Sequence, residues 1–170
     1  MDAMSCRLAA ASLVALLLAP ALPAAAAEDD ALIGLWATEP DEFGYAHVRI
    51  RREGDEYRGE IVWLSEPTFP DSEGPEWAGK PKVDRLNPDP ALRDRPIIGL
   101  PLLWGFRAKG PGQWAGGFIY DPASGKTYKC KITLQDDGTL KVRGFVGISL
   151  LGRTTIWRPV AEAAAEPDAK

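Results

Sequence analysis

The sequence predicts an all-β protein, specifically a small antiparallel up-and-down β-barrel of about eight strands with a long Pro-rich loop. Three observations predict it: segments in which apolar and polar residues alternate, turn-forming residues between those segments, and glycines inside several of them. The expected strands cover residues 35–38, 45–52, 57–64, 102–109, 114–120, 127–134, 140–146 and 152–158. A β-sandwich fits the same pattern, so both architectures stay open at this point.

The first expected hairpin covers residues 45–64. Ala46, Val48 and Ile50 alternate with charged or polar neighbours, which predicts a strand with one apolar face. Residues 53–55, Glu-Gly-Asp, form a turn. The next strand then places four residues on one face: Tyr57, Gly59, Ile61 and Trp63.

The later strands are separated by equally clear turn signals. Residues 121–126 read Asp-Pro-Ala-Ser-Gly-Lys and residues 136–138 read Asp-Asp-Gly, both typical of hairpin connections. The last strand contains the β-branched run 154–156. Glycines inside strands favour sharp coiling or β-bulges, which a closed barrel needs; they are Gly59, Gly116, Gly117 and Gly144.

Residues 65–101 interrupt this pattern with a long segment rich in proline and charge. Asp89 followed by Pro90 is typical of a capped helix start, so a short helix is expected there. Because the apolar run 97–100 must pack against something, we expect an ordered flap over one opening or face of the barrel. Its polar residues are expected to bond to turn amides and to each other: Asp84, Asn87, Asp89, Arg93 and Arg95.

The N-terminus has the three parts of a secretory signal peptide. Arg7 supplies the positive charge, residues 8–22 are mostly apolar, and residues 25–27 are small. Cleavage is expected after residue 27, ahead of Glu28, which would make the protein periplasmic or secreted. A retained membrane anchor is the alternative, but the apolar stretch is short for a bilayer span. The barrel domain would then cover residues 28–160, and the alanine-rich tail 161–170 is expected to be disordered.

Charge and composition exclude several function classes. The net charge of −4 argues against a nucleic-acid partner, which favours a basic surface. No segment after the signal peptide is long and apolar enough to be a transmembrane helix. Only Cys130 follows the cleavage site, so it is expected to be a buried thiol without a disulfide partner in the chain.

No catalytic constellation is evident. His47 is the single histidine of the chain, on the polar face of its strand, and no nucleophile motif accompanies it. His47 and Cys130 do not have zinc-ligand spacing, so no metal or cofactor is expected. Glu60 and Glu66 are conceivable as a carboxylate pair, although acids are frequent in the chain. We therefore expect a non-catalytic protein and rank a hydrolase as the least favoured reading.

Aromatic side chains are the more informative feature. Each one packs in a core or lines a cavity for an apolar or ring-shaped ligand, and the sequence leaves both open. The candidate ligand-binding residues are Trp63, Trp104, Phe106, Trp114, Tyr120 and Tyr128. The expected function is binding of a small apolar or amphipathic ligand. The alternative is a structural or interaction module of the cell envelope that works through its surface and long loop.

A set of short motifs resembles the bacterial envelope proteins grouped as domain of unknown function 2147. The motifs are Gly-Leu-Trp (34–36), Asn-Pro-Asp-Pro (87–90), Arg-Pro-Ile-Ile-Gly-Leu (95–100), Ile-Tyr-Asp-Pro (119–122), Gly-Lys-Thr-Tyr (125–128), Arg-Gly-Phe-Val-Gly (143–147) and Thr-Ile-Trp-Arg (155–158). The resemblance implies a calycin (lipocalin-like) barrel outside the cytoplasm, with no agreed catalytic residues. It also implies that Gly34 and Trp36 close one barrel end beneath Arg158, or less favourably Arg153, through a cation–π contact.

Overall fold

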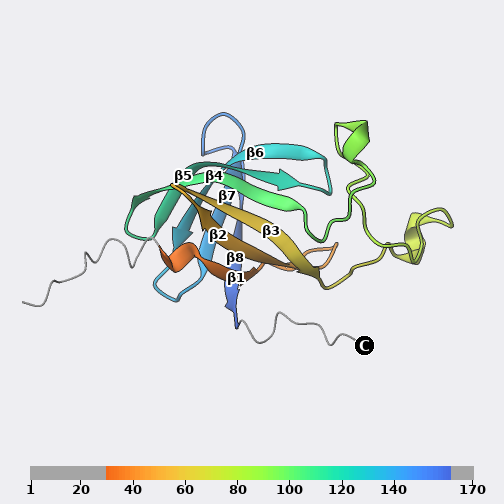
Figure 1. Cartoon of the computed structure of the whole chain (residues 1–170), viewed down its shortest axis with the longest axis horizontal. Coiled ribbons are helices and arrows are strands. Elements are labelled where there is room, and N and C mark those ends of the chain that lie inside the picture. Colours follow the sequence, from red (N-terminus) through yellow and green to blue (C-terminus); the bar gives the residue numbers. More distant parts are fainter. Residues whose placement is uncertain (1–29, 162–170) are drawn as a thin grey trace, which may run out of the picture.

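The segments of alternating apolar and polar residues form the strands of a closed barrel (Figure 1). The structure is a computed structural model that describes residues 30–161. Its strands are β1 (Gly34–Ala37), β2 (Ala46–Glu53), β3 (Glu56–Leu64), β4 (Pro101–Gly110), β5 (Gln113–Asp121), β6 (Lys126–Leu134), β7 (Leu140–Phe145) and β8 (Gly152–Val160). The expected signal peptide, and the expected tail apart from Ala161, lie outside the described residues.

Each strand pairs antiparallel with the next, and β1 pairs with β8 to close the sheet. The closing register places Leu35 opposite Val160 and Trp36 opposite Pro159. Closure confirms the predicted eight-stranded up-and-down barrel and excludes the sandwich. The helices in the part of the chain that the structure describes are single 3₁₀ turns: η1 (Asp30–Leu32), η2 (Asp71–Glu73) and η3 (Pro90–Leu92). None of the helices in the described residues 30–161 is long and apolar enough to cross a membrane.

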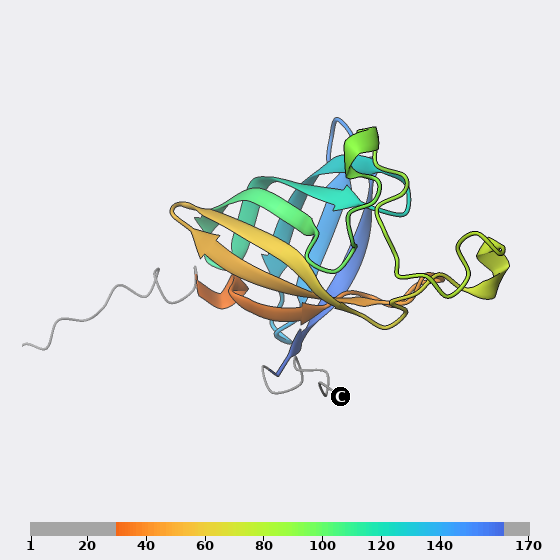
Figure 2. The same ribbon diagram turned by 45° about the vertical axis from the view of Figure 1, so that its right-hand side comes forward.

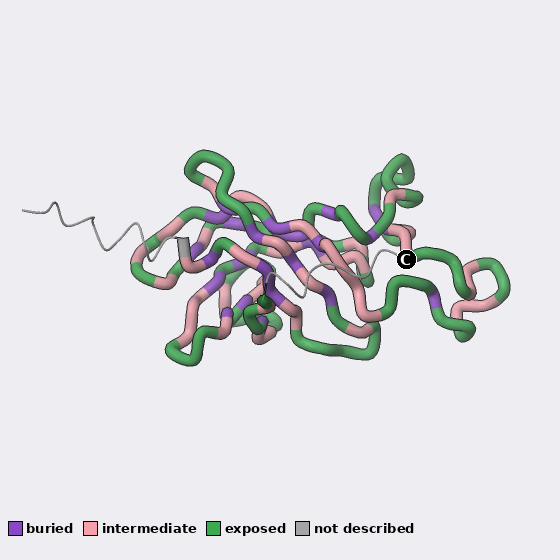
Figure 3. The backbone as a smooth tube through the Cα atoms, turned by 60° about the horizontal axis from the view of Figure 1, so that its bottom comes forward, coloured by how far each residue is buried: buried purple, intermediate pink, exposed green. Residues whose placement is uncertain are grey.

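Large side chains occupy the middle of the barrel. Tyr57, Phe106 and Trp114 are the largest fully buried residues. The Phe106 ring lies directly against Gly117, where any Cβ atom would collide with it. This close approach explains the strand glycine at 117, because a larger residue would displace the ring from the core. Figure 3 shows that buried positions recur along the barrel strands.

Strands β4 and β5 each contain one extra residue, a β-bulge, which reverses the alternation of inward and outward side chains along the strand. Tyr57 and Gly59 of β3 lie opposite Phe106 and Leu103 of β4, so β4 uses one more residue than β3 over this stretch. In the same way Trp114 and Gly117 of β5 lie opposite Ile132 and Cys130 of β6. Such bulges bend and coil strands, as the glycine pattern predicted. They place Phe106 and Trp114 inside the barrel and Trp104 outside it.

The long connection between β3 and β4, residues 65–100, has two parts (Figure 2). The first part projects away from the barrel as a small folded lobe. There the Arg85 guanidinium carbon lies 4.7 Å from the centre of the Phe69 ring, and Arg85 also pairs with Glu73 at 2.8 Å. The second part returns to the barrel: the Gly99 amide donates to the Ile61 carbonyl at 2.7 Å and Leu100 is buried. The predicted helix start is present, because Asp89 caps η3 by accepting from the Ala91 amide at 3.0 Å.

Candidate functional site

The up-and-down order places four connections at one end of the barrel. They follow β1, β3, β5 and β7, and they span residues 38–45, 65–100, 122–125 and 146–151. The longest of them contains Asp84, the one fully buried charged residue among residues 30–161. The candidate site therefore centres on Asp84.

Asp84 is the centre of a buried polar network. Its Oδ1 atom accepts a hydrogen bond from the Tyr120 hydroxyl at 2.6 Å. Its Oδ2 atom accepts from Asn87 Nδ2 at 2.7 Å and from two Arg95 nitrogens, Nε at 2.9 Å and Nη2 at 2.8 Å. A buried carboxylate is tolerated only with such a complete set of partners. The network therefore fixes the loop to β5, which carries Tyr120.

Tyr120 is buried because the long loop covers it. Tyr120 follows Ile119 on β5 and lies on the outer side of the barrel, where Asn87 Nδ2 also approaches its hydroxyl at 3.3 Å. Burial, followed by the hydrogen bond to Asp84, raises the pKa of Tyr120 to about 12. Tyr120 is thus a neutral donor over the physiological range and holds the charge of Asp84 in place.

The loop meets the hairpin between β5 and β6 at a glycine. The Leu86 carbonyl lies so close to Gly125 that a Cβ atom there would collide with it. Gly125 also has φ of +68°, a conformation that favours glycine. The Gly-Lys-Thr-Tyr motif therefore serves two purposes, since it turns the hairpin and admits the loop backbone.

A cleft opens between the returning part of the loop and the outer side of β4 and β5. We call it the loop cleft; its volume is about 260 Å³. The lining residues are Asn87, Pro88, Arg95, Pro101, Trp104, Tyr120 and Thr127. Trp104 stacks on the exposed Phe118 with ring centres 6.0 Å apart and presents a half-buried indole to the cleft. The cleft thus combines an indole and two prolines with a guanidinium already oriented by Asp84.

Five of the six predicted aromatic residues fall into three environments. Tyr120 and Trp104 line the loop cleft. Phe106 and Trp114 are core residues of the barrel, and the Trp114 indole nitrogen has no hydrogen-bond partner among the described residues. Tyr128 is half-buried beside Gly144 on the inner side of the sheet.

Trp63 differs from the expected arrangement. A register shift between His47 and Val48 places Trp63 opposite His47, whereas Ile61 lies opposite the buried Val48. Trp63 therefore does not share the inward face of Tyr57 and Ile61. Its ring centre lies 4.5 Å from that of His47, with Tyr45 beside both. Trp63 thus belongs to an outer aromatic cluster and not to the loop cleft.

All five polar loop residues named from the sequence make hydrogen bonds. Three of them, Asp84, Asn87 and Arg95, form the buried network. Asp89 caps η3, and Arg93 Nε donates to the Asn87 carbonyl at 2.9 Å. Arg93 and Asp89 thus support the loop around Asn87 and do not line the cleft themselves.

The opposite barrel end is closed by apolar side chains. Trp36 is buried and its indole nitrogen donates to the Leu32 carbonyl at 3.0 Å. Gly34, with its extended positive φ, begins β1 just ahead of it. The expected cation–π contact is not formed: Arg158 lies opposite Ala37, is exposed, and is not among the cations found over rings in the described residues. The alternation of β8 explains this, because Trp157 points inward and its neighbour must point out.

The ionisable groups considered for chemistry are dispersed. His47 packs with Tyr45 and Trp63, and partial burial lowers its pKa. Glu60 pairs with Arg51 at 3.4 Å. Burial raises the pKa of the Cys130 thiol to about 12, so the thiol is protonated and unreactive at neutral pH. Within residues 30–161 no group of three His, Cys, Asp or Glu side chains is arranged to hold a metal ion.

Sequence reasoning missed three cleft residues: Pro88, Pro101 and Thr127. Pro88 and Thr127 belong to motifs that were recognised, Asn-Pro-Asp-Pro and Gly-Lys-Thr-Tyr, but nothing in either motif indicates that the two segments meet. The co-occurrence of these motifs with Ile-Tyr-Asp-Pro, which contains Tyr120, was the available signal.

The closed barrel and its end loops define the class of the protein, a lipocalin-like β-barrel. The chain belongs to the bacterial family DUF2147, described as an uncharacterized protein conserved in bacteria, whose model matches residues 34–158. A similar solved structure is a Helicobacter pylori protein described as belonging to the lipocalin family. It has a TM-score of 0.65 and 22% sequence identity, over 78% of this chain and 85% of that chain. No curated protein matches this chain. The family and the barrel fold inferred from the motifs are confirmed.

Proposed function

We propose that the protein is an exported, non-catalytic barrel that binds a small amphipathic ligand in the loop cleft. The observation that carries the proposal is that Arg95 and Trp104 line the same cleft, where the Arg95 guanidinium carbon lies 5.8 Å from the centre of the Tyr120 ring. The indole and the two prolines favour a flat apolar group, and the guanidinium favours an acceptor or an anionic group on the same molecule.

The buried network prepares the cleft for binding. Asp84 holds Arg95 through Nε and Nη2, so the guanidinium is oriented before a ligand arrives. Binding then loses less side-chain entropy, because the cation does not have to be ordered. The cleft volume of about 260 Å³ lies just below the common range of about 300–1,000 Å³ for ligand pockets. We therefore infer a ligand with about one ring and a short polar group.

The barrel interior is a poorer candidate for the ligand. Tyr57, Phe106 and Trp114 occupy its middle, and the Phe106 ring lies against Gly117. A ligand in the interior would have to displace these side chains, at a cost similar to that of overpacking a core. The outer cleft requires no such displacement.

Export is the second part of the proposal. It rests on Arg7, the apolar residues 8–22 and the small residues 25–27. The expected mature protein starts at Glu28 in the periplasm or outside the cell. N-terminal sequencing of the protein recovered from its own compartment tests this, and a retained Met1 would contradict it.

Native mass spectrometry tests the ligand site. Protein purified from the periplasm of its host is expected to carry a small added mass that Trp104→Ala loses, because the indole face of the cleft is removed. Binding of the extracted ligand should weaken at least about tenfold in this variant, equivalent to about 1.4 kcal/mol.

Trp63→Ala is the matched control, since it removes an indole from the outer cluster and leaves the cleft intact. It should retain the ligand. Equal loss from both variants, or an added mass that Trp104→Ala keeps, would contradict the cleft as the site.

A second function, interaction through the surface, is favoured by one observation. Several apolar side chains between β7 and β8 are exposed, including Leu150 at 82%. This surface lies apart from the loop cleft.

A further inference from the structure

The connection between β7 and β8, residues 146–151, carries an unusual density of exposed apolar side chains. We call it the apolar loop. Val146, Ile148, Leu150 and Leu151 are between 61% and 82% exposed. Isolated exposed apolar residues are common on proteins, but a contiguous group marks a surface that contacts another apolar phase.

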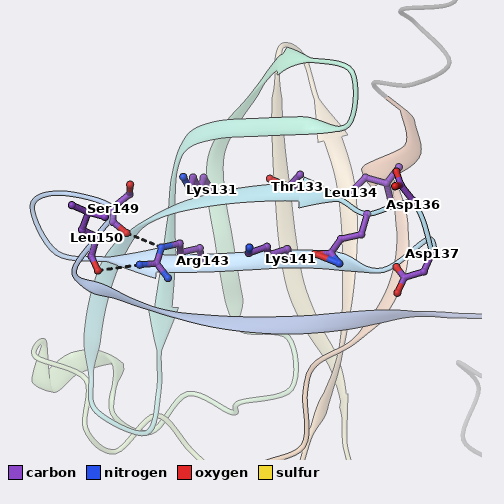
Figure 4. Close-up of a pocket in the computed structure, with 10 residues that line it drawn as sticks. Lys131, Thr133, Leu134, Asp136, Asp137, Lys141, Arg143, Ser149 and Leu150 are labelled. Carbon is purple, nitrogen blue, oxygen red and sulfur yellow. Dashed lines mark hydrogen bonds between the residues drawn. The ribbon is translucent and has the colours of Figure 1, made fainter.

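The apolar loop is held in one conformation by an arginine. Arg143 Nε donates to the Ser149 carbonyl at 2.7 Å, and Nη2 donates to the Leu150 carbonyl at 3.1 Å. The third nitrogen, Nη1, donates to Thr154 Oγ1 at 2.7 Å. Figure 4 shows Arg143 reaching these carbonyls from β7. All three side-chain nitrogens of Arg143 thus donate, two to carbonyls and one to a hydroxyl. The arginine therefore shapes the loop and is not the cation that a partner would meet.

Lysines next to the apolar loop supply available positive charge. Lys129 and Lys131 point outward from β6, opposite Phe145 and Arg143 of β7. Lys141 continues the row along β7. None of these lysines forms an ion pair within the described residues. This basic strip is notable in a chain whose net charge is −4.

A shallow groove runs along this face, and its two ends differ in charge. It has a volume of about 780 Å³ and is lined by Lys131, Lys141, Arg143 and their neighbours. Ser149 and Leu150 border one end, while Asp136 and Asp137 border the other (Figure 4). The acidic turn is thus separated from the apolar loop by the lysines, which gives the surface a direction.

We propose that the apolar loop and the adjacent lysines dock onto an anionic phospholipid bilayer. The loop projects from the barrel end (Figure 1), so its side chains can enter the boundary between head groups and acyl chains while Lys129 and Lys131 lie at the head groups. The acidic turn then points away from the negatively charged surface. A bilayer fits better than a protein partner, because lysine is depleted in protein–protein interfaces and favoured at anionic lipid surfaces.

Vesicle flotation tests the proposal. The mature protein is expected to float with vesicles of equal parts phosphatidylcholine and phosphatidylglycerol, and to remain behind with phosphatidylcholine alone. High salt should weaken binding to the mixed vesicles, because it screens the lysines. Failure of the wild type to bind the mixed vesicles at low salt would overturn the proposal.

Two variants separate the apolar and the charged contributions. Leu150→Ser is expected to weaken binding about tenfold or more, through loss of a large apolar side chain from the bilayer. Lys131→Gln should weaken binding about fivefold, the contribution of one lysine near an anionic surface.

The matched controls lie at the opposite end of the barrel. Ile33→Ser removes an exposed apolar side chain just ahead of β1, and Lys109→Gln removes an exposed charge near the end of β4. Both should bind vesicles like the wild type, as should Trp104→Ala. Losses in the controls equal to those in the test variants would overturn the proposal. So would a lipid-free dimer that Leu150→Ser dissociates, since a second copy would then be the occupant.

Discussion

Two connections at the same end of the barrel carry apolar side chains and present them in opposite ways. The β3–β4 connection buries Ile97 and Leu100 against the barrel. The apolar loop between β7 and β8 leaves Leu150 and Leu151 in solvent. The longer segment has more backbone to order, yet it is the one with the buried side chains.

The difference lies in how each connection is fixed. The β3–β4 connection buries the carboxylate of Asp84, which accepts a hydrogen bond from the Tyr120 hydroxyl of β5. The apolar loop is held by Arg143, from its own hairpin, through carbonyl groups. Long-range anchoring makes the first connection part of the core. Local anchoring leaves the side chains of the second available for another surface.

The largest effect that this comparison predicts follows from removing Asp84. Asp84→Ala should lower the free energy of unfolding by about 3–5 kcal/mol, because Arg95 is left half-buried without its carboxylate. Urea denaturation measures it. Asp94→Ala, at an exposed position of the same loop, is the control and should change stability by less than about 0.5 kcal/mol. A small loss in Asp84→Ala would mean that the loop is not anchored by this network.

The buried apolar side chain of the long connection gives the second prediction. Leu100 is 1% exposed, so Leu100→Ala should cost about 2–5 kcal/mol through lost burial and a cavity. Urea denaturation under the same conditions tests it. A cost below about 1 kcal/mol would show that the returning part of the loop is loosely packed.

Tyr120→Phe gives a smaller effect with a distinctive pH dependence. Losing a hydrogen bond to a charged group should cost about 1.5–3 kcal/mol at neutral pH. The pKa of Tyr120 is raised from its ordinary 10.0 to about 12, so the folded state holds the phenolic proton more tightly than the unfolded state. This contribution is complete below pH 10 and is lost as the pH rises toward 12.

The stability difference between wild type and Tyr120→Phe should therefore narrow above pH 10. Thermal unfolding at a series of pH values measures it. A difference that stays constant across this range would contradict the assigned role of the hydroxyl.

The sequence was sufficient for the barrel but not for the site. Alternation and turn residues predict every strand to within a few residues, because these signals are local. The hydrogen bond between Asp84 and Tyr120 joins residues 36 positions apart, and no local pattern encodes it. The same limit applies to the aromatic residues. Trp104 and Phe106 have the same parity in the sequence, but the extra residue between them sends one outward and the other into the core.

Hydrogen exchange compares the two connections without mutation. The Ile97 amide donates to the Lys82 carbonyl within the connection, and the Gly99 amide donates to the Ile61 carbonyl of β3. Opening the Gly99 bond therefore requires the loop to leave the barrel. In the apolar loop, Gly147 and Ser149 donate no backbone hydrogen bond within the described residues. The first pair should exchange at least about tenfold more slowly, a difference in opening free energy of about 1.4 kcal/mol. Equal rates would mean that the β3–β4 connection is a mobile linker.

The smallest effect is expected from the apolar loop, where it is the most informative. Leu150 is 82% exposed, so Leu150→Ala removes almost no buried surface and should change the free energy of unfolding by less than about 0.5 kcal/mol. The carbonyl of residue 150 still accepts from Arg143, because the substitution leaves the backbone unchanged. Urea denaturation beside Leu100→Ala makes the comparison between two leucines of the same barrel end. A loss of 2 kcal/mol or more, roughly the value for a buried leucine, would place Leu150 in the core and remove the reason to assign it to a membrane surface.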